Sequence, residues 1–154
     1  EMKSADDHLL SFEYDENGNI KYDNRNRSPL LKNQYYNFDC AAGVNYTVDV
    51  SKPVGSRVSI SSMSGGSAFD LNKKYKVAVN SYRGNGGGGH LVTGAGIPKE
   101  ELSKRVITST EKNLRFYIMK WLEKNKVVTP KTNGNWKVIP EEWWQNGKEK
   151  DHGC

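Results

Sequence analysis

The amino-acid sequence predicts an α+β fold, a mixed β-sheet packed with helices, on the basis of three observations. Four segments between residues 35 and 82 alternate apolar and polar side chains, as half-buried strands do. Glycine and proline residues separate these segments. Helical patterns lie towards the two ends of the chain, and strands in a row with helices beside them are typical of this fold class.

Composition is consistent with a single domain over residues 1–154. Hydrophobic residues make up only 35% of the chain, but four Trp, eight Tyr and four Phe bury a large area per residue. The net charge is 23 − 18 = +5, spread along the chain without a basic block. Such a balance tolerates phosphate ligands and does not indicate nucleic acid.

Cysteines and termini add further expectations. Two cysteines make neither a disulfide framework nor a metal site, and Cys40, within an apolar run, is expected to be a buried hydrophobe. We expect no membrane span, because no apolar run is long enough, and we expect no signal peptide among these residues. Because the chain starts at Glu1 without an initiator Met, we expect it to be part of a longer protein.

The first third of the chain is predicted to be mostly polar loop. Residues 2–10 have the pattern of a helix end, and residues 15–19 that of a turn. A hairpin across Asn17 and Gly18 is possible, since this dipeptide favours a type I′ turn. Residues 22–29 are expected to form an exposed loop.

Four strands are predicted next, over residues 35–38, 44–50, 57–63 and 75–82. A helical turn with Pro98 at its first position follows over residues 98–102, and a short strand at 106–107. Thr108 and Glu111 have the spacing of a capping box and predict a helix over 109–126. That helix carries an apolar stripe predicted to belong to the core: Leu114, Ile118, Trp121 and Leu122. The predicted elements end with a turn at 133–134, a last strand at 136–139, and a tail at 140–144 that packs back on the domain.

The most informative segment is the loop after the fourth predicted strand, where five glycines fall within residues 84–89. Its backbone can approach a flat ligand closely, and Tyr82 at its mouth could stack on that ligand. A dinucleotide-binding fingerprint is disfavoured, because two more glycines and Pro98 follow where a helix should start. A flexible linker is disfavoured by the patterned strand beside it. A base-binding loop and an ordered turn without a ligand remain open.

Catalytic signals are few in this chain. His90 is the only histidine near the loop, and it is more simply a loop residue with local hydrogen bonds than a general base. No metal-ligand spacing and no Ser-His-Asp context is found, so no catalytic or metal residue is predicted. By its residues alone, the chain is a binder more plausibly than a catalyst.

Two blocks in this sequence, residues 36–58 and 74–87, resemble the C-terminal domain of a family of hydrolases. This is the 5′-nucleotidase and 2′,3′-cyclic-nucleotide 2′-phosphodiesterase/3′-nucleotidase family, and the resemblance covers about residues 33–128. It implies a nucleoside-recognition domain in which the base lies between two aromatic rings, matched here by Phe38 and Tyr82. The implied substrate-binding residues are therefore Phe38, Tyr82, Arg83, Asn85, Gly86 and Gly87.

The resemblance also carries expectations about the whole protein. Gly88 stands where many 5′-nucleotidases have an Asp, which favours the cyclic-phosphodiesterase/3′-nucleotidase branch. The family's metallophosphatase domain, with its two divalent metal ions, and the arginines that hold ribose and phosphate are absent from these residues. We therefore expect a fragment that is inactive alone, from a periplasmic or cell-envelope enzyme of nucleotide catabolism. The alternative is a non-catalytic nucleoside-binding or interaction module.

Overall fold

The structure is a computed structural model that describes residues 12–25, 27–31 and 37–152, with side chains up to residue 149. The chain divides into two compact units, and each is described on its own. The first unit is Glu1–Leu71 together with Thr132–Cys154, and the second is Asn72–Lys131. The helix end expected at 2–10 lies outside the described residues, as do residues 35 and 36 of the first expected strand. Residues 37 and 38 are not in a strand.

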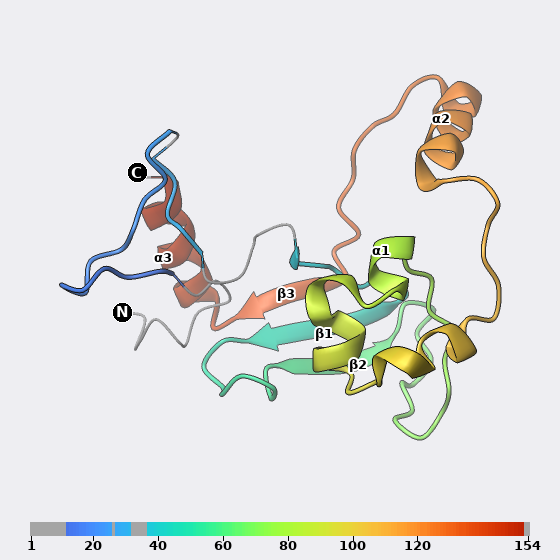
Figure 1. Cartoon of the computed structure of the whole chain (residues 1–154), viewed down its shortest axis with the longest axis horizontal. Helices are drawn as coiled ribbons and strands as arrows, with labels where there is room; N and C mark the ends of the chain where they lie inside the picture. Colours follow the sequence, from blue (N-terminus) through green and yellow to red (C-terminus); the bar gives the residue numbers. More distant parts are fainter. Residues whose placement is uncertain (1–11, 26, 32–36, 153–154) are drawn as a thin grey trace. The chain divides into compact units, whose positions relative to one another are not determined.

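The first unit is built on a three-stranded mixed sheet of order β2-β1-β3 (Figure 1). β1 (Val44–Asp49) pairs antiparallel with β2 (Val58–Met63) and parallel with β3 (Trp136–Ile139). All three strands fall where the alternation of apolar and polar residues predicted them. Together with the helices, this sheet confirms the α+β fold class.

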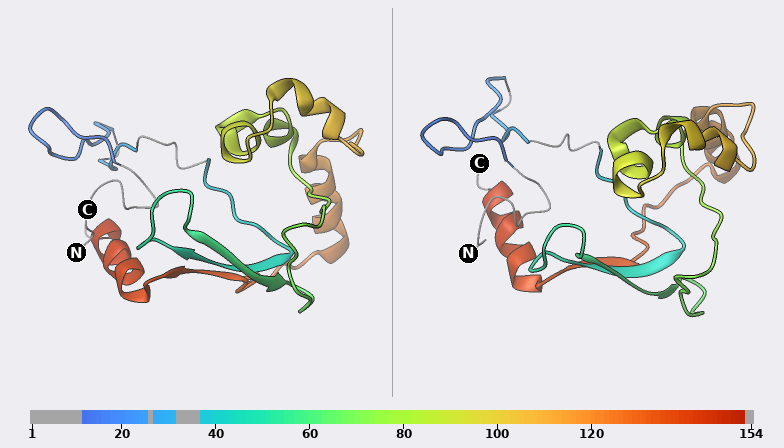
Figure 2. Two further views of the ribbon diagram at one scale, coloured as in Figure 1. Left: turned by 90° about the horizontal axis from the view of Figure 1, so that it is seen from below. Right: turned by 60° about the horizontal axis from the view of Figure 1, so that its bottom comes forward.

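The core of the first unit lies on one face of this sheet. Val48, Val50 and Val138 are buried there, and Val48 is paired with Val138 across β1 and β3. Side chains alternate along a strand, so registered neighbours share a face. Helix α3 (Glu141–His152) follows β3 directly (Figure 2), and its Trp143 and Trp144 pack against the buried valines. The prediction of a tail that packs back is therefore confirmed.

The chain reverses at residues 15–19, as predicted. The Asp15 carboxylate accepts hydrogen bonds from the backbone N–H groups of Asn17 and Asn19, at 2.9 and 2.8 Å. Gly18 takes a positive φ of 80°, which glycine adopts without strain. The flanking bridge joins Tyr14 to Ile20, so five residues separate the paired positions. The reversal is thus a longer loop than the two-residue type I′ turn considered from the sequence.

The second unit contains helices and turns. α1 (Ser81–Gly84) is followed by a 3₁₀ turn at Gly87–Gly89, a π-helical turn at His90–Gly94, and 3₁₀ turns at Lys99–Glu101 and Ser103–Arg105. The helical turn expected after Pro98 is confirmed. The predictions of strands at 75–82 and 106–107 are wrong, because no strand forms among the described residues of this unit. Alternation alone does not make a strand where no neighbour pairs with it.

Helix α2 (Leu114–Asn125) begins five residues later than predicted. The Asn113 side chain accepts a hydrogen bond from the Phe116 N–H at 3.0 Å and caps the helix, whereas Thr108 lies outside it. Asn at this position satisfies one of the unpaired N–H groups of the first turn. The expectation that the apolar stripe belongs to the core is also wrong, because α2 has no buried residue. Its side chains are exposed instead.

Candidate functional site: the glycine loop and its tyrosine

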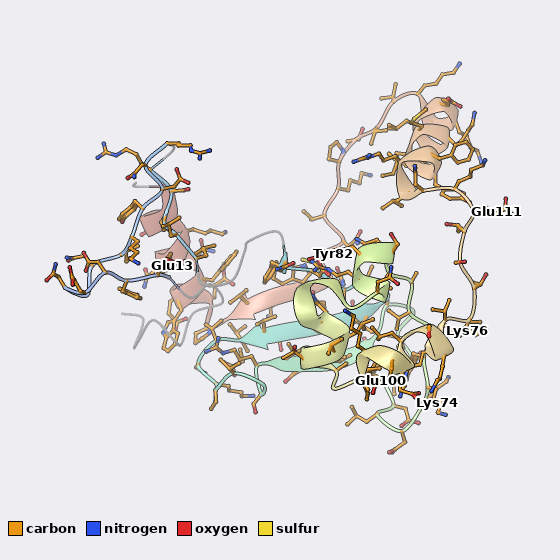
Figure 3. The ribbon with its side chains drawn as sticks, viewed as in Figure 1. Glu13, Lys74, Lys76, Tyr82, Glu100 and Glu111 are labelled. Atoms are coloured by element: carbon orange, nitrogen blue, oxygen red, sulfur yellow. The ribbon has the colours of Figure 1, made fainter. Side chains whose placement is uncertain are left out.

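The glycine loop starts from a short helix that the side chain of Asn80 caps. Asn80 Oδ1 accepts a hydrogen bond from the Arg83 backbone N–H at 2.9 Å. The Asn85 N–H donates to the Ser81 carbonyl at 3.0 Å and closes α1 at its other end. This single turn places Tyr82 and Arg83 at the entrance of the loop, with Tyr82 labelled at α1 in Figure 3.

Tyr82 and Arg83 hold Gly87 from two sides. The Arg83 side chain is 6% exposed, and its guanidinium Nη1 donates to the Gly87 carbonyl at 3.3 Å. The guanidinium carbon also lies 5.3 Å from the centre of the Tyr82 ring, within range of a cation–π interaction. A Cβ on Gly87 would come within 2.5 Å of the Tyr82 ring. Only glycine therefore lets the ring pack against this backbone.

Gly86 packs on the apolar interior of the second unit. It has a φ of 89°, and a Cβ there would meet Leu102 and Val92, each at 3.1 Å. Leu102 is the buried apolar side chain among the described residues of this unit. The loop is thus a packed structure, which excludes the linker interpretation. Because no strand directly precedes the loop and the segment directly after it, His90–Gly94, is a π-helical turn and not an α-helix, the dinucleotide fingerprint is excluded as well.

Tyr82 remains available to a ligand. Its side chain is 56% exposed even though part of its ring lies against Gly87, and the Asn85 side chain of the same loop is exposed too. The structure therefore brings together five of the six expected site residues in one loop: Tyr82, Arg83, Asn85, Gly86 and Gly87. A half-exposed aromatic ring, one exposed side-chain amide and a buried guanidinium against the ring suit a flat polar ligand.

Phe38, the sixth expected residue, belongs to the first unit. Its ring lies 6.1 Å from that of Trp136 at an angle of 51°, and Trp136 in turn stacks on Tyr46 at 6.0 Å. Phe38 is half exposed. Because Phe38 and Tyr82 lie in different units, their facing one another across a base stays a prediction.

A shallow groove of about 480 Å³ lies in the first unit near Trp136. Residues 40–42, the segment 132–138 and two side chains of α3, Glu141 and Trp144, line it. Cys40 is one of these lining residues and is an exposed free thiol. The expectation of a buried Cys40 is therefore wrong, because residues 37–43 run beside the sheet and not within it.

Some residues that support the site were missed by the sequence reasoning. Asn80 could have been recognised as a helix cap, since Asn before a helical turn is a common start signal. Trp136 contacts Phe38, but the two residues are about a hundred positions apart in the sequence, so no local pattern indicates this contact. Among the described residues, no group of three or more His, Cys, Asp or Glu side chains is placed to hold a metal ion. The described helices are each too short or too polar to span a bilayer.

The mixed sheet and the helices beside it define an α+β domain, and comparison with known families places this domain in a nucleotidase-related class. The chain belongs to the 5′-nucleotidase C-terminal domain family, whose model matches residues 10–94. The match begins before the resemblance seen in the sequence and ends at the last residue of the turn that follows the glycine loop. It contains β1, β2 and all six expected site residues, whereas α2 and β3 lie beyond it.

A curated relative is the trifunctional nucleotide phosphoesterase protein YfkN of Bacillus subtilis (strain 168). It is 30% identical to this chain over 119 residues, an alignment that covers 68% of the chain and 7% of the relative. The chain thus spans a small part of that relative's length. No solved structure matches the chain significantly.

Proposed function

We propose that this chain recognises the nucleoside part of a substrate for a nucleotidase or a 2′,3′-cyclic-nucleotide phosphodiesterase. The observation that carries the proposal is the half-exposed Tyr82 ring held against Gly87, with the Arg83 guanidinium beside it. Stacking of a base on such a ring contributes about 1–3 kcal/mol and tolerates different bases. The family match and the nucleotide phosphoesterase relative support this choice of ligand.

In this proposal Phe38 supplies the second ring. Phe38 is half exposed, so its ring is accessible to a ligand. Because the ring already contacts Trp136, binding a base would cost little additional side-chain entropy. Asn85 and the backbone of Gly86 and Gly87 would contact the ribose edge.

Hydrolysis itself is proposed to belong to a metallophosphatase domain elsewhere in the protein. That domain would use two divalent metal ions to activate a water for attack on phosphorus. We place the whole protein in the periplasm or cell envelope, as an enzyme of nucleotide catabolism. Purified alone with Mn²⁺ or Zn²⁺, this chain should therefore not hydrolyse nucleotides above background. Metal-dependent turnover that co-purifies with the chain would overturn the assignment of hydrolysis to another domain.

The binding proposal is tested by titrating the chain with adenosine and following amide shifts by NMR. We expect weak binding, on the order of millimolar, which corresponds to about −4 kcal/mol. Replacing Tyr82 by Ala should abolish the shifts around residues 80–90, and Phe38→Ala should weaken binding. Tyr22→Ala is the matched control, because Tyr22 is similarly exposed but lies far along the sequence from the loop.

Two results would contradict the proposal. If adenosine shifts no resonance of residues 80–90, the loop is a structural turn without a ligand. If Tyr82→Ala unfolds the second unit, Tyr82 is a structural residue. A chain that binds nucleosides but has no phosphatase partner in the cell would instead support the non-catalytic binding module.

A further inference from the structure

Helix α2 presents apolar side chains that nothing in the described part of its unit covers. We call five of them the α2 stripe: Leu114, Tyr117, Ile118, Trp121 and Leu122. Their spacing of three and four residues places them on one side of the helix. They are 44% to 61% exposed, and no other described helix of the unit packs along α2. Extended segments connect α2 on both sides (Figure 1).

An exposed apolar stripe of this length marks an interaction surface. In an ordinary surface helix, the stripe is the part that faces the core. Here the family match ends at residue 94, so α2 lies outside the segment that the family model describes. The stripe therefore needs an occupant that the described residues of the second unit do not provide.

The charge around the stripe indicates what that occupant is. Residues 112–126 contain five basic residues and one acidic residue, a net charge of 5 − 1 = +4, while the whole chain carries +5. With 3.6 residues per turn, Arg115 and Lys126 fall along one border of the stripe, and Lys124 along the other. Glu123 is engaged by Lys120 at 2.7 Å. Apolar side chains bordered on both sides by cations thus form one surface.

A second copy of the chain is a poor occupant, because two helices of charge +4 would repel one another. An anionic phospholipid surface fits both properties at once. Its phosphates attract the basic side chains, and the layer beneath the headgroups accepts the stripe. Trp121 and Tyr117 are of the residue types enriched at this boundary, and lysine stems extend along apolar surface to place their charge in water.

We propose that α2 is an interfacial helix that lies on an anionic phospholipid membrane, with the α2 stripe at the boundary between headgroups and acyl chains. The binding is peripheral and separate from nucleoside recognition. The proposal rests on the exposure and charge of α2 and does not depend on the ligand of Tyr82.

Co-sedimentation of the whole chain with vesicles tests the proposal. One set contains phosphatidylcholine alone, and the other contains phosphatidylcholine and phosphatidylglycerol in a 3:1 ratio. We expect at least tenfold stronger binding to the anionic vesicles, and a steep loss between low salt and about 0.5 M NaCl, where charge screening is strong. Equal binding to both sets, or no binding to either, would overturn the proposal, and the second result would point to a protein partner.

Two kinds of variant separate the apolar and charged contributions. Ile118→Asp should remove vesicle binding, and the double change Arg115→Gln with Lys124→Gln should reduce it at least tenfold while leaving the stripe intact. Matched controls are Val54→Asp, at an exposed apolar position outside α2, and Lys74→Gln with Lys76→Gln, two lysines labelled in Figure 3. The controls should bind as the original chain does.

The helicity and the oligomeric state of the chain and its variants are measured together with vesicle binding. Far-ultraviolet circular dichroism checks that α2 persists in the charge variant, so that a loss of binding is not a loss of the helix. Light scattering checks the mass of the chain in solution. Dimers that Ile118→Asp dissociates would identify a second copy as the occupant and would overturn the membrane proposal.

Discussion

At the scale of single residues, the candidate site depends on what glycine lacks. Gly87 allows the Tyr82 ring to lie against the backbone, and Arg83 fixes the same peptide through its carbonyl. Burial of the Arg83 guanidinium requires such partners, because an unpaired charge is costly away from water. The exposure of Tyr82 and the burial of Arg83 are thus two parts of one arrangement.

Replacing Gly87 by Ala should therefore disturb the site while leaving the fold intact. The new Cβ would overlap the Tyr82 ring, which must turn away and lose its position beside Arg83. We expect a loss of about 1–3 kcal/mol in nucleoside binding, the contribution of one stacked base. Adenosine titration by NMR measures it. Gly84→Ala is the control, since its nearest neighbour is Val79 at an ordinary 3.7 Å. Unchanged affinity in Gly87→Ala would show that the ring position is not needed.

A second residue-scale prediction concerns pH and Asp49, at the end of β1. The Ser51 hydroxyl donates a hydrogen bond to the Asp49 carboxylate at 2.6 Å. This bond, together with the Ser51 backbone N–H and the positive charge of Lys52, holds the pKa of Asp49 below its ordinary value of 3.8. A pKa lowered by folding stabilises the fold above the ordinary value, and that contribution is lost as pH falls through the folded pKa. Ser51→Ala should thus raise the Asp49 pKa.

Carboxyl resonances followed by NMR from pH 6 to 2 measure this pKa in both proteins. Asp49→Asn should lower the melting temperature at pH 7, and the difference from the original chain should shrink below pH 3.8. A melting-temperature difference that stays constant down to pH 2 would show that the charge of Asp49 does not stabilise the fold.

At the scale of elements, local side chains decided where helices begin. α1 and α2 both start after an asparagine whose side-chain oxygen accepts from the N–H three residues later. The capping box at Thr108 had the right spacing, yet Asn113 provides the cap. For the strands, the predicted positions of β1, β2 and β3 are confirmed, because each of these segments pairs with a neighbouring strand.

Two substitutions compare the predicted and observed caps of α2. Asn113→Ala should lower the helicity of residues 114–125, because loss of an N-cap costs about 1 kcal/mol and no buried packing compensates in this helix. Thr108→Ala should have no effect. Amide hydrogen exchange of the first turn of α2 measures both. Equal destabilisation by the two changes would indicate that the helix extends to Thr108 in solution.

At the scale of the whole molecule, burial is concentrated in few places. The first unit rests on three buried valines with four aromatic rings around them, and the second on Leu102 and the packed glycine loop. A small core makes each buried side chain important, because net stability is a small difference between large terms. Helix α2 contributes no buried side chain.

Val138→Ala is therefore expected to destabilise the protein strongly. Val138 is 3% exposed, and its truncation should cost about 2 kcal/mol in free energy of unfolding through lost burial and a residual cavity. Thermal unfolding followed by circular dichroism measures the change, and a fall of several degrees is expected. Val54→Ala, at a position 78% exposed, should be neutral. A neutral Val138→Ala would mean that the sheet face is not the core.

The sequence by itself determined the α+β class, the positions of β1, β2 and β3, the turn at residues 15–19, and the blocks that place the chain in its family. These properties follow from local alternation, turn residues and motif spacing. Only the tertiary structure decided that residues 75–82 form no strand and that Trp136 supports Phe38. It also decided that the α2 stripe is exposed within its unit. Periodicity specifies which side of a segment is apolar, whereas pairing and burial depend on partners distant in the chain, and no local pattern encodes them.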